Sequence, residues 1–116
     1  MPHILRAADR QPGPSRTVKF EGAPFGANVS FFAVDADPGK GAPLHVHPYS
    51  EVWMVQSGTV RFRVGEETVM GTPGDIVVVE PNTPHGFINP GDAPLKMMCI
   101  HDADTIVQTN LEDAPC

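Results

Sequence analysis

The sequence predicts an all-β domain folded as a sandwich or barrel, and three observations support this class. Thirteen prolines and 11 glycines make up about a fifth of the 116 residues, nearly twice the usual share of about 12%. They recur between short apolar runs, which is the pattern of turns between strands. Past Phe25, the only long stretch without Gly or Pro lies near the C-terminus, so a helical architecture is not expected.

Short apolar and β-branched runs predict the individual strands, spaced about 8–12 residues apart. Thr59–Val64 alternates, with its apolar residues on one face and Arg61 and Arg63 on the other. Ile76–Val79 is entirely apolar, which predicts a strand buried on both faces. The expected strands are, in order, Thr17–Phe20, Val29–Asp35, Pro43–His47, Val52–Gln56, Thr59–Val64, Glu67–Met70, Ile76–Val79, His85–Asn89, Leu95–His101 and Thr105–Gln108.

Length and composition fit one globular domain. Hydrophobic residues make up 41% of the chain and charged residues 19%, which is typical neither of a disordered chain nor of a membrane protein. We expect a Pro- and Gly-rich N-terminal arm over residues 1–16, a barrel over 17–109 and a C-terminal tail over 110–116.

The charge balance and the start of the chain limit the partners. A net charge of -6 argues against nucleic acid, whose phosphates would be repelled. No apolar run approaches the roughly 18 residues that span a bilayer, and the first residues lack the apolar core of a secretory signal. We therefore expect a cytoplasmic protein with no nucleic-acid or membrane partner. Reduced thiols are then favoured for Cys99 and Cys116, although a disulfide between them stays open.

Four residues with metal-binding side chains fall where strands can bring them together. His45 and His47 are separated by one residue, so in a strand both imidazoles lie on the same face. Glu51 follows after a turn and shares a strand face with Trp53, and His85 opens a later strand. Three imidazoles and one carboxylate suit one divalent first-row transition metal ion.

The spacing of these residues resembles the first motif of the cupin superfamily. Gly39 stands six residues before His45, and Gly58 stands seven residues after Glu51. With His47 in register between them, every position of that motif is filled.

A second cupin motif is matched in part. Gly74, His85 and Asn89 stand at the expected positions, whereas Glu80 replaces a proline and Asn82 replaces a glycine. The second change is mild, because Asn tolerates the left-handed backbone that Gly supplies. The first is also mild, because neighbouring prolines keep the turn stiff.

The resemblance extends over nearly the whole chain past about residue 17, and the chain looks similar to small bacterial single-domain cupins. It implies a conical antiparallel jelly-roll barrel, also called a double-stranded β-helix. It further implies one ion of Fe, Mn, Ni, Zn or Cu, held by His45, His47, Glu51 and His85. The alternative, in which these histidines only form hydrogen bonds within strands, is less favoured for an intact four-ligand set.

Side chains beside this set have both a structural and a functional interpretation. Trp53 and Phe87 either fill the core or form a pocket wall against which a flat substrate stacks. Asn89 either closes a turn or bonds a ligand histidine. His101 and Tyr49 are the candidate catalytic residues, with His101 either a proton shuttle at the pocket mouth or a satisfied strand-end histidine.

Three functions follow from such a site. An octahedral ion with these ligands has two adjacent free positions and a net charge of about +1, which suits an anionic oxygen donor. A dioxygenase-like oxidoreductase is favoured because it needs only the metal and a small substrate. A Lewis-acid isomerase, lyase or decarboxylase needs a general base, for which His101, Tyr49 and Glu80 are candidates. A non-catalytic module that binds a small ligand is the third. Arg61 and Arg63 could bind an anion, but a solvated face, or an ion pair with Glu66 or Glu67, is the simpler expectation.

The outer strand faces predict a homodimer. Phe31 and Phe32 point to opposite faces of one strand, so one of them needs cover outside the lumen, and Ile76–Val79 poses the same problem. We expect a two-fold dimer that buries more than about 1,000 Å² in total. The N-terminal arm could reach the partner near Thr17–Phe20.

Overall fold

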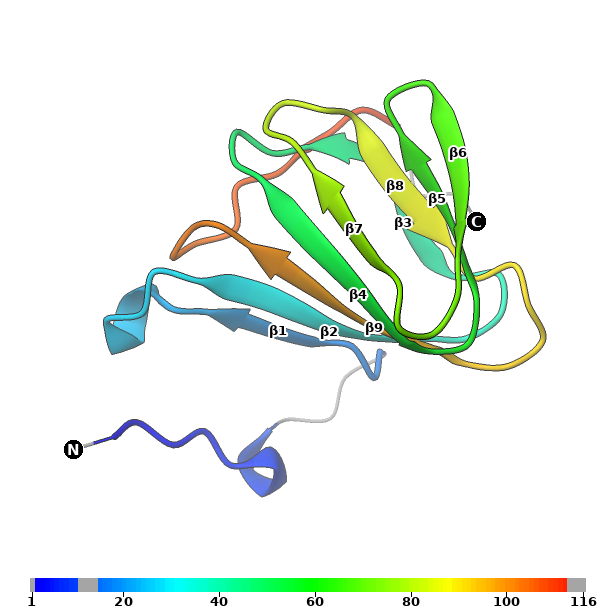
Figure 1. Cartoon of the computed structure of the whole chain (residues 1–116). Helices are drawn as coiled ribbons and strands as arrows, with labels where there is room; N and C mark the ends of the chain where they lie inside the picture. Colours follow the sequence, from blue (N-terminus) through cyan, green and yellow to red (C-terminus); the bar gives the residue numbers. More distant parts are fainter. Residues whose placement is uncertain (1, 11–14, 113–116) are drawn as a thin grey trace.

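Two antiparallel five-stranded sheets enclose a common core in the computed structural model, which describes residues 2–10 and 15–112 (Figure 1). One sheet has the strand order β1-β2-β9-β4-β7 and the other β10-β3-β8-β5-β6. The chain crosses repeatedly between the sheets, and the all-β jelly-roll prediction is confirmed. The strands are β1 (Val18–Glu21), β2 (Ser30–Ala36), β3 (Gly41–Val46), β4 (Glu51–Ser57), β5 (Val60–Val64), β6 (Glu67–Gly71), β7 (Ile76–Val79), β8 (His85–Ile88), β9 (Leu95–His101) and β10 (Thr109–Asn110), with short 3-10 helices η1 (Ala7–Asp9) and η2 (Ala23–Phe25).

The core lies between the sheets and is built from alternate residues of each strand. On β4, Trp53 and Val55 are buried while Met54 between them is exposed, as in a strand with one face inward. The indole of Trp53 stacks on the ring of Phe62 from the other sheet, with 4.3 Å between centroids and 7° between planes. Glu51 occupies the same inward face of β4, so apolar packing and the polar cluster share one strand surface.

The predicted strand Thr105–Gln108 is wrong. Residues 105–108 join no sheet, and the last strand is β10, which pairs with β3. The physical reason lies in the hydrogen bonds of this segment, which go to side chains. The amide of Ile106 donates to Glu21 Oε2 and the amide of Val107 donates to the Tyr49 hydroxyl.

Within one chain, Ile76–Val79 is buried on one face only, and not on both as the apolar run predicts. Ile76 and Val78 are 58% and 62% exposed, and only Val79 is fully buried. β7 lies at the edge of its sheet, and no second layer of the described residues covers its outer side.

Phe31 finds its cover within the chain. Its ring stacks on Phe20 with 5.0 Å between centroids, and Phe20 in turn stacks on Phe25 at 5.7 Å. Phe32, on the opposite face of β2, turns toward the barrel interior and lines a cavity there. The two phenylalanines therefore lie on opposite faces, as expected.

Arg61 and Arg63 are exposed, which fits the predicted solvated face, and Arg63 pairs with a glutamate other than the two considered. Arg63 Nη1 lies 3.0 Å from Glu112 Oε2, rather than pairing with Glu66 or Glu67. The reason is that Glu112 is brought alongside by the last described residues, whose amides bond to the Leu44 carbonyl.

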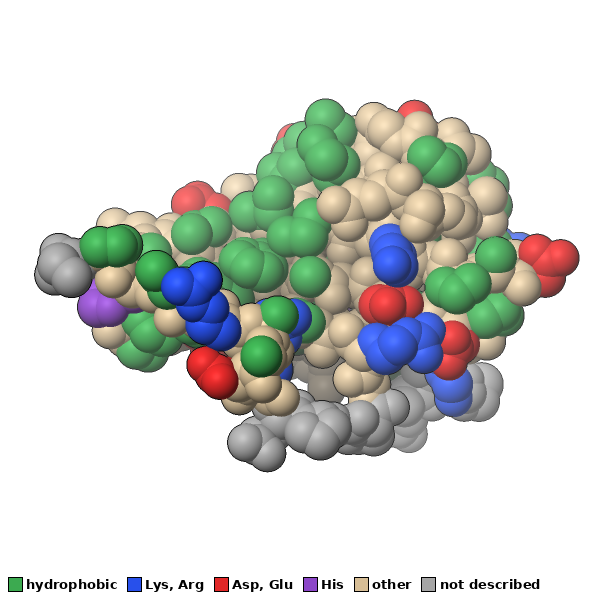
Figure 2. Space-filling view, turned by 90° about the horizontal axis from the view of Figure 1, so that it is seen from below, with side chains coloured by type: hydrophobic (Ala, Val, Ile, Leu, Met, Phe, Trp, Pro, Cys, Tyr) green, Lys and Arg blue, Asp and Glu red, His purple; other side chains and the backbone are tan. Residues whose placement is uncertain are grey.

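Among the described residues, no helix is long and apolar enough to cross a membrane. Seen from below, the surface carries apolar side chains gathered in its middle, with charged groups beside them (Figure 2).

Candidate metal centre

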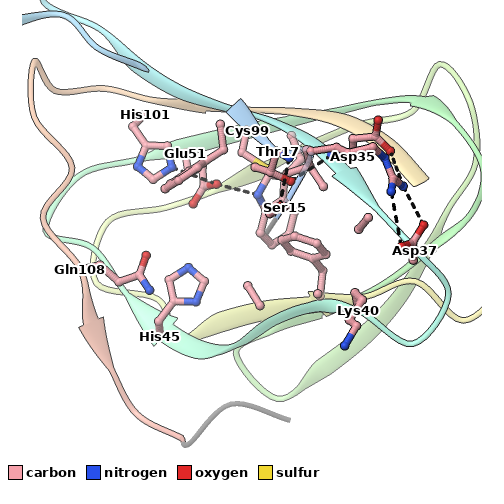
Figure 3. Close-up of a pocket in the computed structure, with 18 residues that line it drawn as sticks. Ser15, Thr17, Asp35, Asp37, Lys40, His45, Glu51, Cys99, His101 and Gln108 are labelled. Carbon is pink, nitrogen blue, oxygen red and sulfur yellow. Dashed lines mark hydrogen bonds and ion pairs between the residues drawn. The ribbon is translucent and has the colours of Figure 1, made fainter. Parts of the chain in front are cut away.

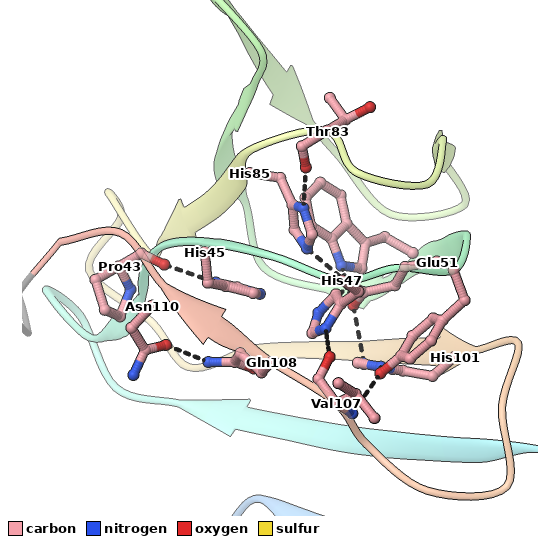
Figure 4. Close-up of polar contacts among 12 residues, drawn as sticks. Pro43, His45, His47, Glu51, Thr83, His85, His101, Val107, Gln108 and Asn110 are labelled. Atoms are coloured by element: carbon pink, nitrogen blue, oxygen red, sulfur yellow. Dashed lines mark hydrogen bonds and ion pairs between the residues drawn. The ribbon is translucent and has the colours of Figure 1, made fainter.

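The four predicted ligands are brought together at one end of the barrel interior. One ligand atom from each of His45, His47, Glu51 and His85 lies within 4.8 Å of the others, and all four side chains are buried. His45 belongs to β3 and sits opposite the first residue of β8, His85, in the ladder. Glu51 opens β4, so the cluster joins both sheets (Figure 4).

Each of the three imidazoles is held by a main-chain carbonyl through Nδ1. The contacts are His45 Nδ1 to Pro43 O at 2.7 Å, His47 Nδ1 to Val107 O at 2.7 Å, and His85 Nδ1 to Thr83 O at 2.8 Å. A carbonyl oxygen only accepts, so Nδ1 carries the proton in every ring. Nε2 is therefore the nitrogen of each ring that is available to a metal ion, as in metal-binding histidines.

Glu51 Oε1 faces two of these Nε2 atoms. It lies 2.9 Å from His85 Nε2 and 3.3 Å from His47 Nε2. Among the described residues, His47 Nε2 is buried without any hydrogen-bond partner. Lone pairs that face each other at such distances are held together only by a proton or a cation. The donor set therefore fits a divalent transition metal ion.

The second carboxylate oxygen of Glu51 is held by other side chains. Trp53 Nε1 donates to Oε2 at 2.7 Å, and His101 Nε2 lies 3.3 Å from the same oxygen. Burial by itself raises the pKa of this carboxyl. Where a proton rather than a metal ion occupies Nε2, hydrogen bonds from His101, His47 and His85 outweigh burial and hold the pKa well below its usual value. Glu51 is thus ionised, with Oε1 aimed at the histidines.

Burial also keeps His45 neutral. Desolvation lowers the pKa of His45 to about 4, although the Pro43 carbonyl opposes the shift. A neutral imidazole at physiological pH is the form that binds a metal.

The two candidate catalytic residues are in contact with each other. Tyr49 Oη lies 2.7 Å from His101 Nδ1, and the hydroxyl also accepts a hydrogen bond from the Val107 amide at 3.2 Å. His101 is buried, with Nε2 toward Glu51, whereas Tyr49 is half-buried. Burial raises the pKa of the Tyr49 phenol, so the hydroxyl keeps its proton.

A cavity of about 530 Å³ opens onto this cluster. Its lining includes His45, Glu51 and His101, together with the predicted wall residues Trp53 and Phe87. Trp53 is therefore both a wall residue of the cavity and part of the core.

Asn89 does not line that cavity. Its side-chain amide donates to the carbonyls of Ala36 and Ala93, and its Oδ1 accepts from the Gly91 amide. Asn89 therefore closes the turn after β8. Glu80, the third candidate base, is exposed and lies outside the cavity lining.

Three contributors were not anticipated from the sequence. The Val107 carbonyl orients His47, the Trp53 indole anchors Glu51, and Cys99 lies in the cavity wall. The Trp53 role could have been predicted from the sequence, because an indole N–H can reach a carboxylate two residues away on the same strand face. Burial, with Glu51 nearby, raises the pKa of the Cys99 thiol. Cys116 lies outside the described residues.

The curated relatives are enzymes much longer than this chain. The chain is 35% identical over 74 residues to mannose-1-phosphate guanylyltransferase RfbM of Salmonella typhimurium, covering 63% of this chain and 15% of that protein. It is 26% identical over 94 residues to mannose-1-phosphate guanylyltransferase 2 of Escherichia coli O157:H7, covering 80% of this chain and 20% of that protein. The chain thus spans a fifth or less of these relatives.

Solved structures share the fold at low sequence identity. A Bacillus subtilis oxalate decarboxylase variant matches with a TM-score of 0.79 and 24% identity, over 92% of this chain and 31% of that chain. Recombinant oxalate oxidase in complex with glycolate matches with a TM-score of 0.74 and 20% identity, over 87% and 57% of the two chains. Because the sequence model of the cupin domain family matches residues 32–101, well over half of the 116 residues, this chain belongs to the cupin family.

Proposed function

We propose that this chain is a small metal-dependent oxidoreductase, dioxygenase-like in its chemistry, acting on a small oxygen-donor molecule in the barrel cavity. His45, His47, Glu51 and His85 would hold one divalent transition metal ion. The observation that carries the proposal is the orientation of the three imidazoles, whose Nδ1 atoms are all held by carbonyls. This leaves three Nε2 lone pairs and one carboxylate oxygen directed at a common point.

A bound ion of this class supplies a Lewis acid, and Fe, Ni or Cu also supplies redox chemistry with dioxygen. Among the structural neighbours, one Bacillus subtilis oxalate decarboxylase structure is described by its Mn(II) centres. This supports a divalent ion and leaves its identity open.

The chain's own residues have separable tasks in this proposal. Trp53 holds Glu51 Oε2 by a hydrogen bond, which leaves Oε1 as the ligand oxygen. His101 Nε2 has no hydrogen-bond partner among the described residues, so it is free to exchange a proton with a substrate oxygen.

A second candidate function is a Lewis-acid isomerase, lyase or decarboxylase. The Tyr49–His101 contact favours it, because a buried imidazole backed by a phenol hydroxyl is the general base that such chemistry needs. Tyr49 is half-buried and could connect His101 to solvent.

The test begins with elemental analysis of protein purified without a metal-affinity tag. Chelator-stripped protein is then reloaded separately with Fe²⁺, Mn²⁺, Ni²⁺, Zn²⁺ or Cu²⁺ and assayed for dioxygen uptake with diketones, catechols and enols. The proposal expects uptake that requires both a redox-active ion and a substrate. The His101→Asn variant should retain its metal and show a lower rate of dioxygen uptake.

Other outcomes separate the alternatives. Product formation without dioxygen uptake, with Mn²⁺ or Zn²⁺ sufficient, would establish the Lewis-acid enzyme instead. Ligand binding without turnover under every metal would leave a binding module, and failure to bind any metal would overturn both enzymes.

A further inference from the structure

We propose that the cavity selects an oxygen-donor substrate with an aromatic or branched apolar body, and disfavours a small dianionic acid. This inference rests on the proposed metal site and names the class of molecule that the site accepts. It is carried by the distribution of polar and apolar groups along the cavity.

The cavity has a polar group of residues at each end. Figure 3 shows His45, Glu51, His101 and Gln108 at one end, and Asp35, Asp37 and Lys40 at the other. Apart from Ser15 and Thr17, the remaining wall is mainly apolar and includes Phe32, Val34, Ala36, Trp53, Phe87 and Cys99. When the metal-binding group of a substrate lies at His45 and Glu51, the rest of the substrate therefore lies against aromatic and aliphatic side chains.

The volume exceeds what a two-carbon acid needs. A water molecule in the liquid occupies about 30 Å³, so the cavity of about 530 Å³ equals roughly 18 such volumes. Oxalate, with its six non-hydrogen atoms, would leave most of the apolar wall uncovered. A phenyl or branched alkyl group would fill it and remove apolar surface from water.

A second carboxylate would find no free cation deep in the cavity. Among the described lining residues the cations are Arg16 and Lys40. Lys40 lies at the far end (Figure 3), and Arg16 contacts Asp35 and Asp37 of that end. Arg16 Nη2 is already engaged, at 3.1 Å from Asp35 Oδ1 and 2.6 Å from Asp37 Oδ1. An unpaired carboxylate buried against the apolar wall pays a desolvation penalty without compensation.

The test compares three 2-hydroxy acids that share one metal-binding head. Lactate carries a methyl group, malate adds a second carboxylate, and 3-phenyllactate adds a phenyl ring. Isothermal titration into Ni²⁺-loaded protein should rank 3-phenyllactate about 10- to 100-fold tighter than lactate, and malate weakest. Trp53 is the only tryptophan and lines the cavity, so its fluorescence gives an independent binding signal.

A paired set of variants locates the selectivity. Ala36→Leu narrows the apolar section and should weaken 3-phenyllactate about tenfold or more, while lactate binding changes little. Ala93→Leu adds the same side chain at an exposed position outside the cavity lining and should change neither affinity. Thermal unfolding checks that both variants fold, and the ranking in the unmodified chain does not depend on either.

The outcomes distinguish this inference from the proposed function. Metal content measured before and after titration reports on the ligand set, and protein that binds none of Fe²⁺, Mn²⁺, Ni²⁺, Zn²⁺ or Cu²⁺ overturns both proposals. Metal-loaded protein that binds malate as tightly as 3-phenyllactate overturns the substrate class alone.

Discussion

His47 is the ligand whose environment is most specific to a metal. Its Nδ1 is held by Val107 and its buried Nε2 has no other partner among the described residues. We predict that His47→Ala lowers bound metal by about tenfold or more in elemental analysis. The barrel should still fold, because its core of buried apolar residues does not include His47.

His3→Ala is the matched control, since His3 contacts Phe25 and lies outside the cluster. It should keep full metal content. If His47→Ala instead unfolds in circular dichroism, the metal is structural and the enzyme proposal loses support.

Trp53 acts on the same site through Glu51. Trp53→Phe keeps an aromatic ring against Phe62 but removes the 2.7 Å hydrogen bond to Oε2. We expect metal affinity, measured by chelator competition, to fall about 10- to 100-fold, the range for partners that orient a ligand.

Phe62→Leu separates packing from ligand orientation. It damages the same stacked pair without touching Glu51, so it should lower the free energy of unfolding by about 1–2 kcal/mol and leave metal affinity unchanged. Equal loss of affinity in both variants would mean that packing, not the hydrogen bond, positions the carboxylate.

At the scale of elements, the turn between β7 and β8 positions His85. Asn82 has φ of 63°, the left-handed conformation expected where it replaces the motif glycine, and its amide donates to the His47 carbonyl at 2.8 Å. Asn82→Val should cost about 1–2 kcal/mol of unfolding free energy, because a β-branched side chain is strained in this region. Urea denaturation measures it.

Asn82→Gly is the control, and it should unfold at the same urea concentration as the parent or higher. The side chain of Asn82 is exposed, so the valine meets no packing clash that could mimic strain. Equal stability of the valine and glycine variants would contradict the role of the left-handed backbone.

Strands and metal ligands were predictable where the spacing of residues along the chain indicates which side chains share a face. Alternation placed Trp53 and Glu51 on one inward face, and the His45–His47 spacing placed two imidazoles together. Thr105–Gln108 misled because its apolar residues resemble a strand, whereas its amides bond to Tyr49 and Glu21. The conformation of such a segment depends on side chains distant in sequence, and the local residue pattern does not indicate them.

The same limit applies to residues whose partners come from afar. The Tyr49–His101 contact joins positions 52 residues apart, and the Arg63–Glu112 pair joins positions 49 apart. Each residue was recognisable as chemically capable, but the pairing depends on how segments distant in sequence are brought together by the fold. The Ile76–Val79 error has a different cause, since an apolar run does not say which layer covers it.

At the scale of the molecule, the sheet β1-β2-β9-β4-β7 exposes an apolar outer face. Met54 lies beside Ile76 and Val52 beside Val78 in the β4–β7 ladder, and Ile100 of β9 lies on the other side of Val52. The exposed fractions are 42% for Met54, 58% for Ile76, 62% for Val78 and 38% for Ile100. A contiguous apolar surface of this kind is typical of an interaction site.

We propose that a second copy of this chain covers that face in a two-fold homodimer burying more than about 1,000 Å² in total. Size-exclusion chromatography with light scattering should then give twice the chain mass of 12.5 kDa at micromolar concentration. Val78→Lys should shift the mass to that of one chain, because it buries an unpaired charge at the centre of the interface. Val69→Lys adds the same charge to β6 of the other sheet, at a residue 40% exposed, and should leave the dimer intact. A mass of one chain for the unmodified protein would refute the dimer and require another cover for the outer face of β7.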